Sequence, residues 1–104
     1  MSDKNIINKA IDNYSVLTKL QKRILQSLIK LSVNQEVIVT IEELALLNDA
    51  TRATVSTAIE LLKKLNIITI PDITGVRFSG CCINSSKIEE IIEHYNNKIN
   101  CKKN

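Results

Sequence analysis

Hydrophobic residues recur at helical spacing along the first third of the chain. Apolar positions three or four residues apart predict a short helix within residues 1–15. They are Ile6, Ile7, Ala10, Ile11 and Tyr14. A longer apolar stripe predicts a second helix, which either Ser15 or Thr18 can cap. It consists of Leu17, Leu20, Ile24, Leu28 and Leu31. The opposite side of this second helix is the most basic part of the chain.

The segment that follows carries the start signal of a third helix. Residues 37–39 are a β-branched run that is long enough for one short strand. Thr40 and Glu43 then have the spacing of a capping box, in which each side chain accepts from the backbone amide of the other residue. We therefore expect a helix over 41–47. The side chains that it offers to a core are Leu44, Ala45 and, as a further candidate, Leu47.

Another helix is predicted immediately after a short turn. Residues 48–50 are typical turn residues, and Thr51 is a good N-cap for a helix that runs to about Leu65. Its inward positions are Val55, Ala58, Ile59, Leu62 and Leu65. Asn66 stands where a helix end needs a residue that tolerates positive φ.

The last third of the chain predicts a β-hairpin and a final helix. Residues 67–70 have the pattern of a strand, 71–75 of a turn and 76–79 of a returning strand. Ser86 and Glu89 have the spacing of a second capping box. The helix that it would open carries one apolar side, made of Ile88, Ile91, Ile92, Tyr95 and Ile99.

The predicted order of elements is helix, strand, helix, turn, helix, hairpin, helix. This is a mainly α architecture with a small β-hairpin, and a hairpin directly after the third helix of a tri-helical unit is the topology of a winged helix. Within 39–70 the chain resembles the winged helix-turn-helix segment of prokaryotic transcription regulators and of plasmid or phage replication and partition proteins. The matching positions are Leu44, Ala45, 51–56, Leu62, Ile67 and Ile68. Asn66 and Thr57 stand where that family often has Gly and a basic residue.

The resemblance implies a winged helix-turn-helix with extra N- and C-terminal helices. We expect one domain over 1–104, divided into an N-terminal helix (1–15), a winged-helix core (16–83) and a C-terminal dimerisation helix (86–99). Composition agrees, because two Gly and one Pro are few for an all-β chain with many turns.

Cysteine content indicates the cellular compartment, whereas net charge does not decide whether the chain binds nucleic acid. A net charge of +3 suits a protein that touches phosphates at a few defined points, but it suits many other soluble proteins equally. Three cysteines, two of them adjacent, are not a disulfide framework and favour reduced thiols in a cytoplasm. No stretch has the length of a signal peptide's apolar region or of a membrane span.

The outward face of the helix over 51–65 is the candidate DNA-reading surface. Short hydroxyls near its first turns would let the helix enter a major groove about 12 Å wide, and Arg52 could read a guanine edge or hold a phosphate. The candidate contacts on this helix are Thr51, Arg52, Thr54, Ser56, Thr57 and Lys63. A solvated helix face is the plainer interpretation, and it gains weight because 40–65 holds three cations against four acids.

Further phosphate contacts would have to come from outside this helix. On the hairpin, Arg77 is either a minor-groove or phosphate contact or a shield for the sheet edge. On the second helix the candidates are Lys19, Lys22 and Arg23, although basic helix faces are more often simply solvated.

The final helix is interpreted as a dimer device. An apolar stripe at Ile88, Ile92, Tyr95 and Ile99 exceeds what one tri-helical core covers, and prokaryotic winged helices usually bind two half-sites as two-fold dimers. The alternative is that this helix folds back onto its own core.

No chemistry of its own is expected of the chain. Cys81 and Cys82 point apart in a strand, His94 has no assigned partner and no C-x-x-C occurs, so we expect no metal site and no cofactor. No triad, Gly-rich phosphate loop or zinc-protease motif is present, which argues against an enzyme. The function predicted is sequence-specific binding of double-stranded DNA by a homodimer that regulates transcription or serves replication or segregation, where it would recruit a filament or replication protein. The rival hypothesis is a winged helix used only for protein contact.

Overall fold

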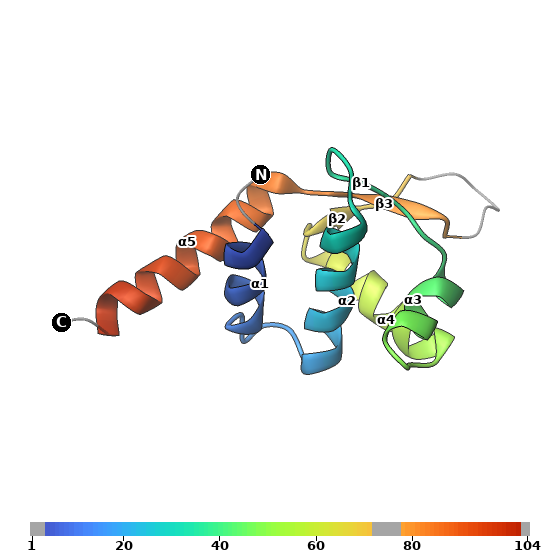
Figure 1. Cartoon of the computed structure of the whole chain (residues 1–104), viewed down its shortest axis with the longest axis horizontal. Coiled ribbons are helices and arrows are strands. Elements are labelled where there is room, and N and C mark those ends of the chain that lie inside the picture. Colours follow the sequence, from blue (N-terminus) through green and yellow to red (C-terminus); the bar gives the residue numbers. More distant parts are fainter. Residues whose placement is uncertain (1–3, 72–77, 103–104) are drawn as a thin grey trace.

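The computed structural model describes residues 4–71 and 78–102, and it is mainly helical with one small sheet (Figure 1). The elements in chain order are α1 (Lys4–Asp12), α2 (Lys19–Leu31), β1 (Glu36–Ile38), α3 (Ile41–Leu47), α4 (Arg52–Lys64), β2 (Ile68–Thr69), β3 (Gly80–Ile83) and α5 (Ser85–Lys102). The predicted fold class, a winged helix-turn-helix with additional terminal helices, is confirmed. Within the described part of the chain, no helix combines the length and apolar character needed to cross a bilayer.

The helix starts follow the side chains that cap them. Thr18, and not Ser15, caps α2, since its hydroxyl accepts from the Gln21 amide at 3.3 Å and its own amide donates to Gln21 Oε1 at 2.9 Å. Thr40 and Glu43 form the predicted capping box of α3, with distances of 3.1 and 3.0 Å. Such caps typically contribute about 1 kcal/mol each. They therefore fix the register of the helices along the chain.

The core lies where α2, α3 and α4 meet under the sheet. The fully or nearly fully buried side chains of α2 and α4 are Ile24, Leu25, Leu28, Ile29, Val55, Ala58, Ile59 and Leu62. Burying an Ile or Leu side chain stabilises the fold by roughly 1.5–3 kcal/mol, so this cluster dominates the stability of the domain. On α3 the inward residues are Leu44 and Ala45, whereas Leu47 is 61% exposed and the prediction that it is a core residue is wrong. The helix has only two turns, and in the second of them Leu47 points away from α2 and α4.

The sheet has three antiparallel strands in the order β1-β3-β2. Val37 pairs with Cys81 and Ile68 with Ile83, so β3 lies between the other two strands. Residues 76–79 were expected to be the returning strand, but the strand that returns is Gly80–Ile83. The reason is burial and pairing: Cys81 and Ile83 alternate into the core, and among the described residues of the hairpin this segment pairs with both β1 and β2. Residues 76 and 77 lie outside the described residues.

Gly80 has a packing role at the start of β3. A Cβ at this position would collide with the carbonyl oxygen of Val37 on the neighbouring strand. The close approach of β1 and β3 therefore requires glycine here. Cys81 is 4% exposed and Cys82 is exposed, which confirms that the two side chains point to opposite faces.

The start of α5 corrects another prediction. The residue that caps this helix is Asn84, whose Oδ1 accepts from the Lys87 amide at 3.4 Å, and the predicted capping box at Ser86 and Glu89 is wrong. Asn84 also donates from Nδ2 to the carbonyl oxygen of Asn66 at 2.8 Å. Asn66 has a φ of 61°, which confirms the predicted positive-φ end of α4.

The terminal helices α1 and α5 pack against each other on one side of the domain. Ile7, Ala10 and Ile11 of α1 are buried, as are Ile88 and Ile92 of α5 at 0% and 7% exposure. Ile88 and Ile92, which were predicted to lie in a dimer surface, are thus buried within the single chain, where α5 packs against α1. Beyond this contact α5 extends away from the body of the molecule, at the end opposite to α3 and α4 (Figure 1). Tyr95 and Ile99 are both partly buried, and Tyr95 packs against the core.

Candidate nucleic-acid interface

The outward face of α4 gathers most of the predicted DNA contacts on one surface. Because Val55, Ala58, Ile59 and Leu62 turn inward at helical spacing, the residues between them face solvent. Those predicted as contacts are all exposed: Thr51, Arg52, Thr54, Ser56, Thr57 and Lys63. The face is continuous from the N-cap to the last turn of the helix.

Hydroxyl groups at the start of this face are partly engaged within the helix. Thr51 Oγ1 accepts from the Thr54 amide at 3.2 Å, and the two threonine hydroxyls lie 2.7 Å apart. Thr57 donates to the carbonyl oxygen of Ala53 at 3.0 Å. Each hydroxyl oxygen has two lone pairs as well as one proton, so these bonds fix the side chains and still leave acceptor capacity toward a ligand.

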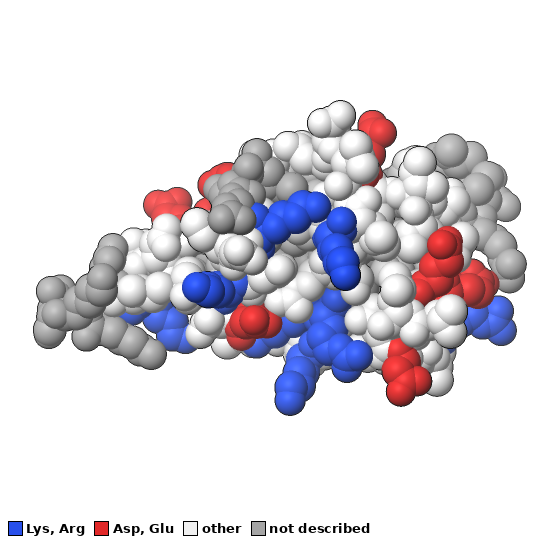
Figure 2. All heavy atoms as spheres, viewed as in Figure 1, with Lys and Arg blue, Asp and Glu red and all other residues white. Residues whose placement is uncertain are grey.

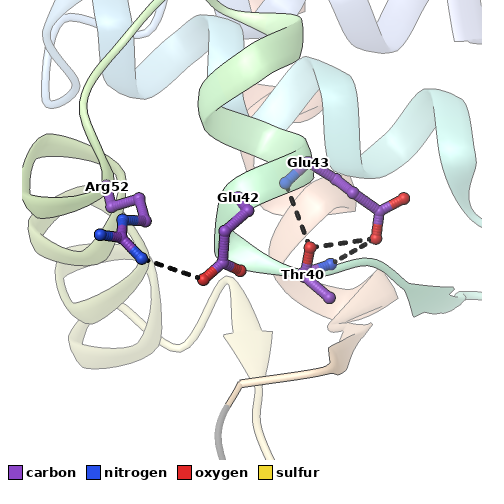
Figure 3. A network of polar contacts seen from close by, with 4 residues as sticks. All are labelled: Thr40, Glu42, Glu43 and Arg52. Carbon is purple, nitrogen blue, oxygen red and sulfur yellow. Dashed lines mark hydrogen bonds and ion pairs between the residues drawn. The ribbon is translucent and has the colours of Figure 1, made fainter.

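Arg52 is paired with an acidic residue from the preceding helix. Its Nη1 lies 3.5 Å from Glu42 Oε1, with the side chains 67% and 50% exposed. Figure 3 shows how this comes about: the Thr40–Glu43 capping box fixes the first turn of α3, and Glu42 then points toward the first turn of α4. Sequence reasoning counted Glu42 only as one acid among four. The partner of Arg52 was not identifiable from spacing, since it depends on how α3 crosses α4.

A groove of about 650 Å³ lies between α4, the start of α3, the residues that follow β2 (Ile70 and Pro71) and the residues that lead into β3 (78–80). We call it the α4–wing groove. Its apolar lining includes Ile59, Ile70 and Phe78. Its charged lining consists of Glu42, Arg52, Glu60 and Lys63. The groove is therefore electrostatically mixed and not a basic channel. Arg77, the predicted contact on the hairpin, lies outside the described residues.

The basic residues of α2 differ in their contacts. Lys19 is exposed, and the first turn of α2 shares a shallow concavity with α4, to which Thr18, Thr54 and Thr57 contribute. Lys22 instead donates to the carbonyl oxygen of Asp12 at 2.8 Å, and Arg23 donates to that of Asn48 at 2.9 Å. These two cations hold the end of α1 and the α3–α4 turn, which gives each of them a structural role.

Charge is distributed unequally over the face drawn in Figure 2. Most of the Lys and Arg side chains in this view gather in the middle of the molecule, over α1 and α2, whereas Asp and Glu side chains lie on the right, over the region of α3 and α4, and also at the top and upper left. A phosphate backbone is attracted to the first of these regions and repelled by the second. Any DNA approaching α4 therefore meets acidic side chains as well as Arg52.

Asn48 is a buried polar residue that sequence reasoning treated only as a turn residue. It is 5% exposed, and its Nδ2 donates to the carbonyl oxygen of Leu44 at 2.9 Å and lies 3.3 Å from Ser27 Oγ. With the Arg23 bond to its carbonyl, Asn48 links α2 to the turn before α4. An asparagine in a turn is ordinarily exposed, so the sequence carried no signal for this network.

The cysteines and the histidine form no ligand cluster in the described part of the chain. No three His, Cys, Asp or Glu side chains there lie close enough together to hold a metal ion. Burial, together with neighbouring Cys82, raises the pKa of the Cys81 thiol from 9.0 to about 11, which keeps it protonated at neutral pH. His94 makes an edge-on ring contact with Tyr14, with centroids 6.3 Å apart.

The comparisons with known proteins bear on this geometry. No curated protein and no solved structure matches the chain. A family model described as "Winged helix-turn-helix transcription repressor, HrcA DNA-binding" matches residues 16–75, which is more than half of the 104 residues. The match runs from the residues before α2 through α3, α4 and β2, so it includes the exposed face of α4. The resemblance recognised in the sequence is confirmed, and the chain belongs to the HrcA-type family of winged helix-turn-helix transcription repressors, a family of DNA-binding proteins.

Proposed function

We propose that the chain represses transcription by placing the outward face of α4 in the major groove of duplex DNA. The observation that carries the proposal is the continuous exposed face of α4, with Arg52 at its N-terminal end and Lys63 at its C-terminal end. A helix of this diameter fits the major groove, and short side chains near its start allow a deep approach.

The proposed contacts fall into two classes. Arg52 reads a base edge, while Thr54 and Ser56 donate to bases or phosphates near the start of the helix. Thr57, whose proton is donated to the carbonyl oxygen of Ala53, accepts from a base amino group instead. The free amides and the positive dipole end of α4 favour a phosphate beside Thr51. Lys19 and Lys63 then engage the sugar-phosphate backbone on either side, and Arg77 of the hairpin would extend these contacts.

We also infer that the chain acts as a two-fold dimer through the second half of α5. Ile99 continues the apolar stripe of α5 after the buried Ile88 and Ile92, and it is only partly buried in the single chain, as is Tyr95. The two halves of α5 differ in net charge: the first half carries Glu89, Glu90 and Glu93 against Lys87, and the second half carries Lys98 and Lys102. Two antiparallel copies of α5 would therefore place acidic halves beside basic halves, as a two-fold axis across the helix allows.

A role in protein contact is the second candidate. It is favoured by the charge balance of 40–65 and by Leu46 and Leu47 of α3, which are 86% and 61% exposed. Replication and segregation proteins would combine both activities, with DNA bound by α4 and another protein recruited. Repression is preferred here because it is what the matching family's description states.

A salt titration tests the proposal. Fluorescence anisotropy of a labelled random-sequence 30-base-pair duplex, measured from about 50 to 200 mM salt, should show binding that weakens steeply as several phosphates are engaged. A chain that binds no duplex at the lowest salt concentration would overturn DNA binding and favour protein contact. Selection from a random duplex pool, followed by footprinting of the gene's own upstream DNA, would then identify the operator.

A further inference from the structure

We propose that Glu42 is a specificity-determining residue of this DNA interface. It orients the Arg52 guanidinium toward base edges and opposes its capture by phosphates. The inference rests on the proposed function, since it concerns what α4 does once it meets a duplex. Glu42 belongs to α3, outside the helix expected to read DNA.

The geometry places the carboxylate within the interface. Glu42 Oε1 lies 3.5 Å from Arg52 Nη1, and both residues line the α4–wing groove. The two hydrogen bonds of the Thr40–Glu43 capping box hold the first turn of α3, which carries Glu42 (Figure 3). The packing of α3 against α4, with Leu44 and Ala45 buried, then places this turn beside Arg52. Both side chains are half or more exposed and within reach of an incoming ligand.

The fold does not depend on this ion pair. Exposed ion pairs are screened by water and salt and stabilise proteins little. The core beneath them is apolar, and α3 already has Glu43 in its first turn to complement the helix dipole. A contact that stabilises little and lies at the mouth of a binding groove is therefore better explained by what it does to the ligand.

The chemistry of arginine separates its two possible ligands. A guanidinium carries five N–H donors, so Glu42 can accept on one edge while another edge donates two bonds to O6 and N7 of a guanine. Guanine offers neutral acceptors, and the nearby carboxylate costs little in that complex. A phosphate is an anion, and it would have to approach the same guanidinium against the charge of Glu42. The pair thus lowers affinity for DNA in general and keeps affinity for a site with a suitably placed guanine.

The test compares Glu42→Gln with Glu36→Gln. Glu36 is exposed on β1, and its substitution changes the net charge by the same amount without altering the α4–wing groove. Each full-length variant is titrated with the random 30-base-pair duplex and with the duplex that the wild type selects from a random pool. Glu42→Gln should bind the random duplex about threefold more tightly at low salt, as expected for one charge removed at several ångströms in water.

Two further readouts accompany this shift. The slope of log affinity against log salt should steepen by about one phosphate contact, because Arg52 becomes available to the backbone. The ratio between selected and random duplexes should fall about threefold or more in Glu42→Gln and stay at the wild-type value in Glu36→Gln. In an Arg52→Ala background, Glu42→Gln should change the affinity for the random duplex by less than half as much as it does when Arg52 is present.

The outcomes separate this inference from the proposed function. If Glu42→Gln and Glu36→Gln behave alike on both duplexes while the wild type binds DNA, the specificity role of Glu42 is wrong and DNA binding stands. If the effect persists undiminished in the Arg52→Ala background, Glu42 acts by general charge and not through Arg52, and the orienting role is wrong. If the wild type binds no duplex, both the proposed function and this inference are wrong.

Discussion

Asn84 Nδ2 donates a hydrogen bond of 2.8 Å to the carbonyl oxygen of Asn66, and this bond joins the end of α4 to the start of α5. A second bond, from the Asn84 amide to the carbonyl oxygen of Ile67 at 2.9 Å, strengthens the same junction. The helix proposed to read DNA and the helix proposed to form the dimer are therefore coupled through one residue.

Replacing this residue should weaken the fold. Asn84→Ala removes the N-cap of α5 and its side-chain bond to Asn66, and we expect the free energy of unfolding to fall by about 1–2 kcal/mol. Urea denaturation followed by circular dichroism measures this change. Ser86→Ala is the matched control, because Ser86 lies inside the first turn and caps nothing. A larger loss in Ser86→Ala than in Asn84→Ala would restore the capping box predicted from the sequence.

Arg52→Ala should weaken DNA binding without unfolding the domain. The side chain is 67% exposed and contributes no buried contact, so the thermal midpoint should be unchanged. Loss of a bidentate contact to a guanine typically costs about 1–3 kcal/mol of binding free energy. Anisotropy with the selected duplex measures the loss. Lys30→Ala, which removes one exposed charge from the last turn of α2, serves as the control. Equal affinities for the two variants would contradict the assignment of α4 as the reading helix.

The local signals in the sequence were sufficient for most of the fold. Thr40, Thr51 and Asn66 each have a side chain or φ preference that acts on the next few residues, and each functions where the pattern predicted. The strand that returns in the hairpin was misplaced because its position depends on pairing with β1, which is distant in sequence. The cap of α5 was misplaced for a similar reason, since Asn84 is held by Asn66 as well as by its own helix.

For the candidate site, the sequence predicted which residues of α4 face outward, but not what they contact. Helical spacing is enough to say which residues of α4 point outward, and the exposed positions agree with it. What those residues touch depends on neighbouring elements. Arg52 meets Glu42 across the α3–α4 turn, and Arg23 meets the carbonyl of Asn48, and neither contact has a sequence spacing that predicts it.

The basic residues of α2 should separate into two groups on mutation. Arg23→Ala removes a hydrogen bond to the α3–α4 turn, and we expect it to lower the free energy of unfolding by about 1–2 kcal/mol. Lys19→Ala should leave stability unchanged, reduce affinity for all duplexes to a similar extent and lower the salt slope by about one. Unfolding curves and salt titrations of both variants provide the measurements. If Lys19→Ala leaves the salt slope at its wild-type value, the first turn of α2 does not contact phosphate.

The dimer can be tested at two positions on the same stripe of α5. Ile92 is 7% exposed against α1, so Ile92→Asp would bury a charge and should destabilise the chain itself, by several kcal/mol. Ile99 is only partly buried near the end of α5, and Ile99→Asp should leave the fold intact while shifting the protein toward monomer. Sedimentation velocity over a range of concentrations measures the association, and circular dichroism checks the fold. Lys98→Gln, next to Ile99 but off the apolar stripe, should weaken association less than Ile99→Asp because it removes only one charge pair. A dimer that survives Ile99→Asp unchanged would show that the second half of α5 is not the interface, and the two-fold arrangement proposed for α5 would have to be abandoned.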